Sequence, residues 1–260
     1  MRRRRVIVSA LALAGGLWSG RSLAQDSGPR GAVVIGVDKC GGLPILSAAG
    51  EGAITVGKWL ETQGFEVKYL TDAKGTKDVR VSDVFDAIEE FVNRGTLEQL
   101  VVYFSGHGFL KNSAEHWMLS RAPVNPNEAA SLTESVEFAK DSGIPNVVFI
   151  SDACRSTPAS LQAERVRPSI IFPNSDPGQN RGDVDKFLAS LPGKPALELP
   201  VDASTSKFQG IFTAAFLKAF KAPDETMVVT LPDGRRVVPN RKLEKYLVRE
   251  VQKMAQERSI

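Results

Sequence analysis

The chain has 260 residues, of which 42% are hydrophobic and 24% are charged. This is the composition of an ordinary globular protein, and it excludes wholesale disorder and fibrous folds of the collagen or coiled-coil type. Two His and two Cys argue against a disulfide-dense scaffold and against a Cys/His zinc site. The formal charge is +3, but five arginines lie within the first 24 residues.

The first 24 residues have the layout of a secretory signal peptide. Residues 2–5 are all arginine, residues 6–18 form an apolar run broken only by Ser9, and residues 22–24 provide small side chains before a cleavage site. An uncleaved membrane anchor is the alternative, but the 13 residues of the run rise only about 20 Å as a helix, short of the roughly 30 Å hydrocarbon core. The arginine run also permits a twin-arginine signal.

Cleavage after Ala24 would leave 236 residues with 28 basic and 30 acidic side chains, a formal charge of −2. The basicity therefore belongs to the signal, and composition gives no support for a nucleic-acid partner. We expect residues 25–31 to form a flexible leader and residues 32–260 to form one domain. The mature protein is expected to be periplasmic or secreted, in an oxidising setting, without a stable membrane anchor.

Hydrophobic patterning predicts strands that alternate with helices along this domain. In chain order we expect a strand at 32–38, a helix at 51–63, a strand at 65–70, a helix from a Ser82 cap to Gly95, a strand at 100–105, a helix at 133–142, a strand at 146–151, a weaker strand at 187–191, a helix at 210–221, a hairpin at 227–238 and a helix capped by Asn240.

This alternation predicts an α/β domain with a mostly parallel central sheet of about six strands and helices on both faces. Ligands of such sheets bind at the carboxyl ends of the strands. Residues 155–185 are rich in Pro, Asn and Gly and show little periodicity, so they are expected to form a long surface loop.

Two of the predicted buried strands end in reactive side chains flanked by small residues. The sequence FSGHG at 104–108 places His107 after one strand, and DACR at 152–155 places Cys154 after the next. If the strands are neighbours, both side chains emerge at one edge of the sheet. A thiolate beside an imidazole suffices for acyl transfer, and the N–H groups of Gly108 and Cys154 are suited to hold a developing oxyanion.

Each residue alone has a plainer interpretation. A single buried Cys is usually an inert small hydrophobe, and a His in a glycine-flanked turn can simply close a strand. The joint pattern favours chemistry, because both follow buried strands and Cys154 lies 47 residues after His107. A caspase-type signature has its His roughly 50 residues before the Cys.

These two motifs resemble those of the caspase-like cysteine peptidases, nearest to the bacterial metacaspase-like branch. The resemblance implies a caspase-like fold and an endopeptidase acting on protein or peptide substrates. It also implies that His107 is the acid/base and Cys154 the nucleophile. We expect no cofactor and no metal, because no acidic cluster matches the calcium site of some metacaspases.

Specificity is predicted from Asp152, which stands where caspases carry Gln. The resemblance to metacaspases implies cleavage after Arg or Lys, since a partly buried carboxylate can hold a guanidinium bidentately. The alternative is that Asp152 only caps the following turn. A second pocket Asp common in the family falls at Gly52, so that ligand is missing unless Glu51 substitutes.

Three further hypotheses concern residues outside the pair. Cys40 follows the first strand and is either a partly buried thiol, which we favour, or the partner of Cys154 in an inactivating disulfide. His116 and Trp117 either line the cleft or, as we prefer, pack in a loop. The 155–185 loop is the place where caspase relatives are often cut during activation, and it offers Arg165, Arg167 and Arg181 for self-cleavage.

The main alternative function is a catalytically inactive caspase-like domain that binds or scaffolds other proteins. The intact pair of His107 and Cys154 favours the enzyme, because acyl transfer needs both groups. A doubly wound nucleotide-binding protein is disfavoured, because neither a phosphate-binding loop motif nor a G-x-G-x-x-G follows the first strand.

Overall fold

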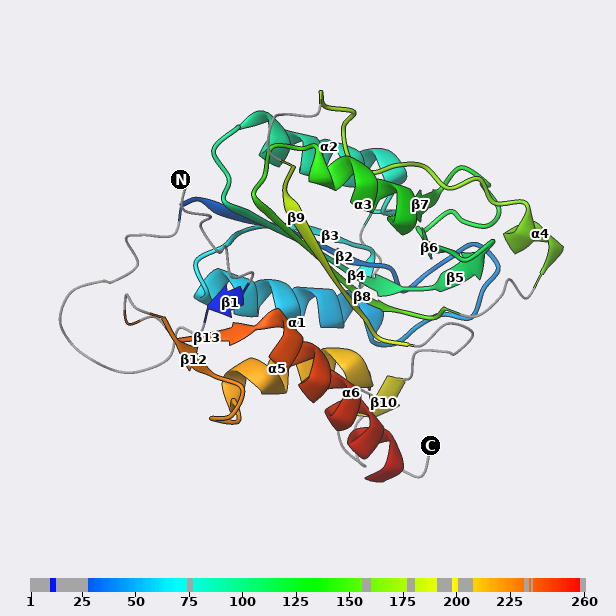
Figure 1. Ribbon diagram of the computed structural model, residues 1–260. Helices are drawn as coiled ribbons and strands as arrows, with labels where there is room; N and C mark the ends of the chain where they lie inside the picture. Colours follow the sequence, from blue (N-terminus) through cyan, green and yellow to red (C-terminus); the bar gives the residue numbers. More distant parts are fainter. Residues whose placement is uncertain are drawn as a thin grey trace.

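The computed structural model describes residues 10–12, 28–73, 77–155, 160–176, 181–190, 198–200, 208–231, 234 and 236–257. Its centre is a parallel five-stranded sheet of order β3-β2-β4-β8-β9 (Figure 1). The strands are β2 (Arg30–Gly36), β3 (Glu66–Thr71), β4 (Gln99–Gly106), β8 (Asn146–Ala153) and β9 (Asp183–Leu188). The predicted α/β class is confirmed, with five sheet strands among the described residues instead of about six.

Helices cover both faces of this sheet, as predicted (Figure 1). One face carries α1 (Ala49–Thr62), α5 (Ile211–Lys221) and α6 (Asn240–Glu257), and the other carries α2 (Val81–Asn93) and α3 (Leu132–Lys140). The continuous apolar runs follow from this arrangement, because a strand between two helical layers buries both of its faces. In β4, Val102 and Phe104 join one core while Val101 and Tyr103 join the other.

Smaller sheets surround the central one. After β4 the chain forms β5 (Gly108–Lys111), β6 (Ala114–Met118) and β7 (Ala129–Ser131), an antiparallel sheet at the carboxyl edge. The predicted hairpin is β12 (Val229–Thr230) and β13 (Arg236–Pro239), and β1 (Ala10–Ala12) pairs with β13. A further pair joins β10 (Glu198–Pro200) to β11 (Phe208–Gly210).

The start of the predicted domain differs in the structure. The expected leader ends earlier than residue 31, because Arg30 and Gly31 already pair with Gln99 and Leu100 in the sheet. Within the predicted signal peptide only residues 10–12 are described, and the rest lies outside the described residues. No helix among the described residues is long and apolar enough to cross a membrane.

The described parts of the 155–185 segment, residues 155, 160–176 and 181–185, contain regular structure. They include the short helix α4 (Leu161–Glu164), and Ser169 bridges Ala130 of β7. Ile171 and Phe172 are buried in the core because they lie against the face covered by α2 and α3. The apolar triplet at 170–172 was the sequence signal for this. The segment also ends in β9, so the weaker strand lies at 183–188 and not at 187–191.

Both predicted N-caps were wrong. Ser82 lies inside α2, whose entry is instead closed by Asp83, since its carboxylate accepts the backbone N–H of Arg80 at 3.0 Å. Asn240 begins α6, but its side-chain amide donates to Asp185 Oδ2 at 2.6 Å. At α6 a contact with a distant residue replaces the local cap that the sequence pattern predicts, and at α2 a local contact of the next residue, Asp83, does so.

Candidate active site

The strand register brings the two sequence motifs together. β4 and β8 are neighbours, and their register pairs Gly106 with Ala153, the last residue of each strand. His107 and Cys154 are therefore the first residues beyond two paired strand ends. Both are partly exposed at the carboxyl edge of the sheet, where α/β proteins bind their ligands.

Close backbone approach at Gly108 shows how tightly the two motifs meet. A Cβ at Gly108 would lie 2.7 Å from the carbonyl oxygen of Cys154 and 3.0 Å from the Cβ of Ala153. Real Cβ atoms do not tolerate such distances, so only glycine allows this packing. The glycine after His107 is thus explained by the position of Cys154.

The imidazole of His107 is oriented by the loop that follows β2. Its Nε2 lies 2.7 Å from the carbonyl oxygen of Pro44. A carbonyl only accepts hydrogen bonds, so Nε2 carries the proton, and in the neutral ring Nδ1 is the acceptor. Sequence analysis missed Pro44, because nothing local to residue 44 signals a contact with a residue 63 positions away.

The same loop is anchored by a buried carboxylate. Asp72 is only 4% exposed, and it accepts the backbone N–H of Asp38 at 2.7 Å and that of Lys39 at 3.2 Å. It also accepts the hydroxyl of Ser120 at 3.0 Å. Asp72 therefore fixes the start of the loop that carries Pro44.

The backbone N–H of Gly108 points away from its hairpin partner. The N–H of Met118 donates to the carbonyl of His107 at 2.8 Å, so His107 and Met118 form a hydrogen-bonded pair. Alternate pairs of an antiparallel ladder leave their N–H groups outside the ladder. Gly108, which pairs with Trp117, therefore directs its N–H away from β6, as an oxyanion donor requires.

The side chain of Asp152, near the end of β8, contacts the first turn of α5. Its carboxylate accepts the backbone N–H of Thr213 at 3.2 Å and the hydroxyl of the same residue. The negative charge is favourable there, because the N-terminus of a helix carries partial positive charge. Asp152 is 6% exposed, and these contacts make it the cap of a helix that is distant in sequence.

A buried polar cluster extends from Asp152 to β4. The hydroxyl groups of Tyr103 and Thr213 lie 2.6 Å apart. Burial, and next the charge of Asp152, raises the pKa of Tyr103, which keeps the phenol neutral. A Cβ at Gly52 would lie 3.6 Å from this phenol oxygen, so position 52 faces the cluster.

Glu51 lies beside Gly52 in the first turn of α1. Its side chain is exposed, and its charge acts on Asp38. Because neighbouring helical residues point about 100° apart, Glu51 and Gly52 face different directions. The role of Glu51 in the pocket stays a prediction.

Cys40, His116 and Trp117, the other side chains considered in the sequence, have structural roles. The thiol of Cys40 is buried and contacts the carbonyl oxygens of Leu119 and Met118 at 3.5 and 3.6 Å. Burial raises the pKa of this thiol to about 12, and no disulfide joins it to Cys154. His116 and Trp117 are buried in β6 and not in a loop, which confirms the preferred packing role.

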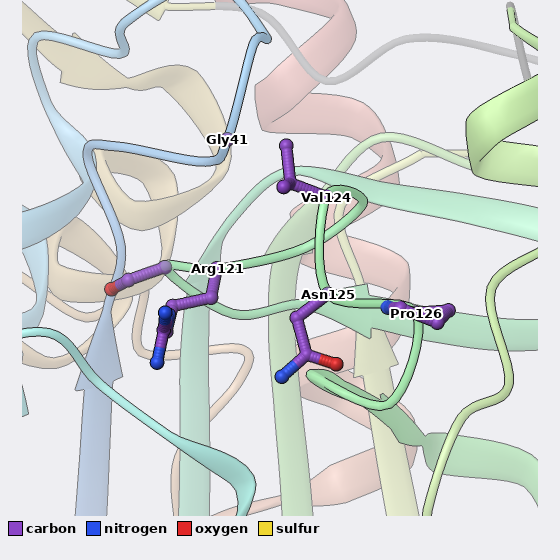
Figure 2. Close-up of a pocket in the computed structure, with 6 residues that line it drawn as sticks. Gly41, Arg121, Val124, Asn125 and Pro126 are labelled. Carbon is purple, nitrogen blue, oxygen red and sulfur yellow. The ribbon is translucent and has the colours of Figure 1, made fainter.

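A pocket of about 580 Å³ is lined by residues other than His107 and Cys154 (Figure 2). It is formed by the loop after β2 and the turn after β6, with Val124 directed toward Gly41. Its lining residues are Gly41, Ser120, Arg121, Val124, Asn125 and Pro126. In the part of the chain that the structure describes, no cluster of three His, Cys, Asp or Glu side chains is arranged to hold a metal ion.

Comparison with known families decides the classification. The family model described as the caspase domain, of peptidase family C14, matches residues 29–256. The chain belongs to the caspase domain family. This family consists of cysteine peptidases, so its members' substrates are proteins.

A solved structure agrees with the fold. The crystal structure of protein GSU0716 from Geobacter sulfurreducens matches with a TM-score of 0.55 and 16% identity, covering 85% of this chain and 88% of that one. At this sequence identity the match supports the fold alone. A comparison with curated proteins finds no match.

Proposed function

We propose that this caspase domain is an active, exported cysteine endopeptidase, in which Cys154 is the nucleophile and His107 the acid/base. The observation that carries the proposal is the meeting of Gly108 with the Cys154 carbonyl, where a Cβ would come within 2.7 Å. It supports a shared cleft in which one peptide group can reach both motifs. The Pro44 carbonyl, which orients the imidazole, supports the role of His107.

The proposed reaction proceeds in two halves. Nδ1 of His107 takes the thiol proton, and the thiolate attacks the carbonyl carbon of the scissile bond. The N–H groups of Gly108 and Cys154 hold the oxyanion. Collapse breaks the C–N bond, and the imidazolium gives its proton to the departing amine. Water, deprotonated by His107, then attacks the thioester and releases the acid and the thiol.

We place the chain in the metacaspase-like branch and propose that it cleaves after Arg or Lys. Asp152 supports this, because it brings a carboxylate into the wall of the cleft two residues before Cys154, in a cluster whose other members are neutral hydroxyls. A guanidinium or ammonium group is the natural partner for such a carboxylate. Capping of α5 and substrate binding are compatible, because a carboxylate accepts several hydrogen bonds.

Self-processing is proposed after one of the arginines at 165, 167 and 181, whose side chains are all exposed. The backbone N–H of Arg165 donates to Leu161 and Gln162 at 3.2 Å, and that of Arg167 donates to Pro126 at 2.7 Å. The side chain of Arg181 is paired with Asp141 at 2.7 Å. Incubated active protein should lose its intact band, and replacing the three arginines by Gln should prevent this.

Peptides with Arg, Lys or Asp before a reporter group test the proposed function. We expect turnover of the Arg and Lys peptides, with Cys154→Ala and His107→Ala each lowering kcat by at least about 10³-fold. Asp152→Asn keeps an acceptor for Thr213 and should lower kcat/KM for the Arg peptide about 10–100-fold. Turnover of the Asp peptide alone would refute the role of Asp152. A folded protein without Cys154-dependent turnover would favour the scaffolding alternative.

A further inference from the structure

A buried carboxylate joins the hairpin that follows His107 to the segment that carries Cys154. Glu115 lies on β6 and is only 4% exposed. One of its oxygens lies 3.0 Å from Nε of Arg155, the residue directly after Cys154. The other accepts the hydroxyl of Ser151 at 3.1 Å, and Ser151 lies three residues before Cys154.

Arg155 and Ser151 are themselves held by further contacts. The guanidinium of Arg155 donates to the carbonyl of Ser190 at 3.0 Å, and the hydroxyl of Ser190 donates to the carbonyl of Ala153 at 3.3 Å. The indole N–H of Trp117 donates to Ser151 at 3.0 Å. Glu115 is therefore the central acceptor of a network that flanks Cys154 on both sides along the chain.

Stability alone does not account for this arrangement. Burial raises the pKa of Glu115 despite the opposing effect of Arg155, so the surroundings disfavour the charged form. The N–H of Arg155 Nε is not aligned as a hydrogen bond, although the two charges lie 3.0 Å apart. Buried ion pairs are often replaceable by uncharged side chains without loss of stability.

We propose that Glu115 is a positioning residue for the nucleophile, which fixes the backbone at Cys154 against the hairpin of His107 by holding Arg155 and Ser151. The inference rests on the proposed function of Cys154 and His107. The hairpin is the right anchor, because Met118 of the same strand is hydrogen-bonded to the backbone of His107. Glu115 thus holds the segments that carry the thiol and the imidazole in a fixed relative position. A displacement of either group by about 1 Å can lower the rate about 10²-fold.

Glu115→Gln tests the proposal, because it removes the charge and keeps an acceptor for Ser151. We expect kcat for an Arg peptide to fall about 10–100-fold with KM changed less than about twofold. The pH profile for alkylation of Cys154 by iodoacetamide should also move to higher pH, since the thiolate loses its neighbouring imidazole. Arg155→Lys, which keeps the charge but not the fork, should show an intermediate loss.

Asp141→Asn is the matched control, because it breaks a carboxylate–arginine pair with Arg181 at the opposite edge of the sheet. It should leave kcat and alkylation unchanged. If Glu115→Gln fails to fold, the double variant Glu115→Gln with Arg155→Gln removes the unpaired charge and carries the same test. Unchanged kcat and alkylation in a folded variant would overturn the proposal, as would a rise in KM alone.

Alkylation is measured without a peptide, so the two proposals can fail separately. A wild-type protein that cleaves no peptide would refute the peptidase. The alkylation profiles of wild type and Glu115→Gln would still decide whether Glu115 positions the thiol.

Discussion

At the scale of single residues, Gly108 limits how the two motifs can be arranged. The carbonyl oxygen of Cys154, the Cβ of Ala153 and the carbonyl oxygen of His116 would lie 2.7, 3.0 and 3.1 Å from a Cβ at this position. Two of these three atoms belong to backbone that cannot rotate away. Any side chain here must push the His107 hairpin away from Cys154.

Gly108→Ala is therefore expected to reduce activity more than stability. We expect kcat/KM to fall at least about 10-fold, because the imidazole and the thiol move apart. Gly234→Ala is the control, since Gly234 has a φ of +84° with open space around it, so alanine costs about 1 kcal/mol of unfolding free energy there. Urea unfolding and peptide kinetics on both variants would decide, and equal losses of activity would contradict the prediction.

At the level of residues, the sequence predicted the site groups that lie within the two motifs, and it did not predict those that lie elsewhere in the chain. His107, Gly108 and Cys154 were predicted because two apolar runs end in reactive side chains next to small residues. Pro44 and Glu115 were missed, because their roles arise from contacts with residues 63 and 40 positions away. Asp152 was found, but its cap on α5 was not, because Thr213 follows it only after 61 residues.

At the scale of elements, the loop between β2 and α1 is as important as the strands for the geometry of the candidate site. It carries Pro44, and it is held at its start by Asp72, which lies just after β3. Two backbone N–H groups and the hydroxyl of Ser120 all donate to this one carboxylate. The orientation of His107 therefore depends on an element that contains no motif.

Asp72→Asn should weaken both the fold and the reaction. An amide presents one acceptor oxygen and one donor group, so at least one of the N–H groups of Asp38 and Lys39 loses its partner. We expect the unfolding free energy to fall by about 1–3 kcal/mol, together with a lower kcat. Ser120→Ala removes one bond to Asp72 and the acceptor of the Val79 N–H at 2.9 Å, but it leaves both N–H groups of the loop bonded to Asp72. It should therefore lower kcat less than Asp72→Asn does. A larger loss of kcat in Ser120→Ala would show that the hydroxyl, and not the carboxylate, holds the loop.

Strands inside the sheet were predicted most closely. β2, β4 and β8 lie inside the sheet and read as continuous apolar runs. The edge strand β3, whose pattern alternates, was predicted to within one residue. β9 lies at the other edge and is only partly buried, so charged residues interrupt its pattern and its position was misjudged. The short helix α4 was hidden by its proline-rich surroundings.

At the scale of the whole molecule, two cores are built on one sheet and the candidate site lies at its edge. Strand residues alternate between the two clusters, so both cores depend on the same five strands. The class, the layer arrangement and the edge that carries chemistry were predictable, because they follow from alternation and from parallel strands. Export concerns a segment of the chain that lies mostly outside the described residues, and both export and processing stay predictions.

The stability of the whole domain should depend on pH through its buried acids. Burial raises the pKa of Glu115 above its ordinary value of 4.5, and that of Asp38 above 3.8. The folded protein then binds protons more tightly than the unfolded chain. As the pH rises above these ordinary values, ionising the two groups in the folded state lowers the unfolding free energy.

Glu115→Gln removes one of these contributions, so its stability relative to wild type should rise between pH 4.5 and pH 7. The lost pair with Arg155 is already included in this trend, because the pair lowers the pKa of Glu115 and burial outweighs it. Glu137 gives the opposite case, because Lys140 lowers the pKa of that exposed carboxylate. Glu137→Gln should lose a little stability relative to wild type as the pH rises, since exposed pairs contribute little. Urea unfolding of the three proteins at pH 4.5, 5.5 and 7 measures both trends. A relative stability of Glu115→Gln that falls with pH would mean that Arg155 outweighs burial and that the pair stabilises the fold.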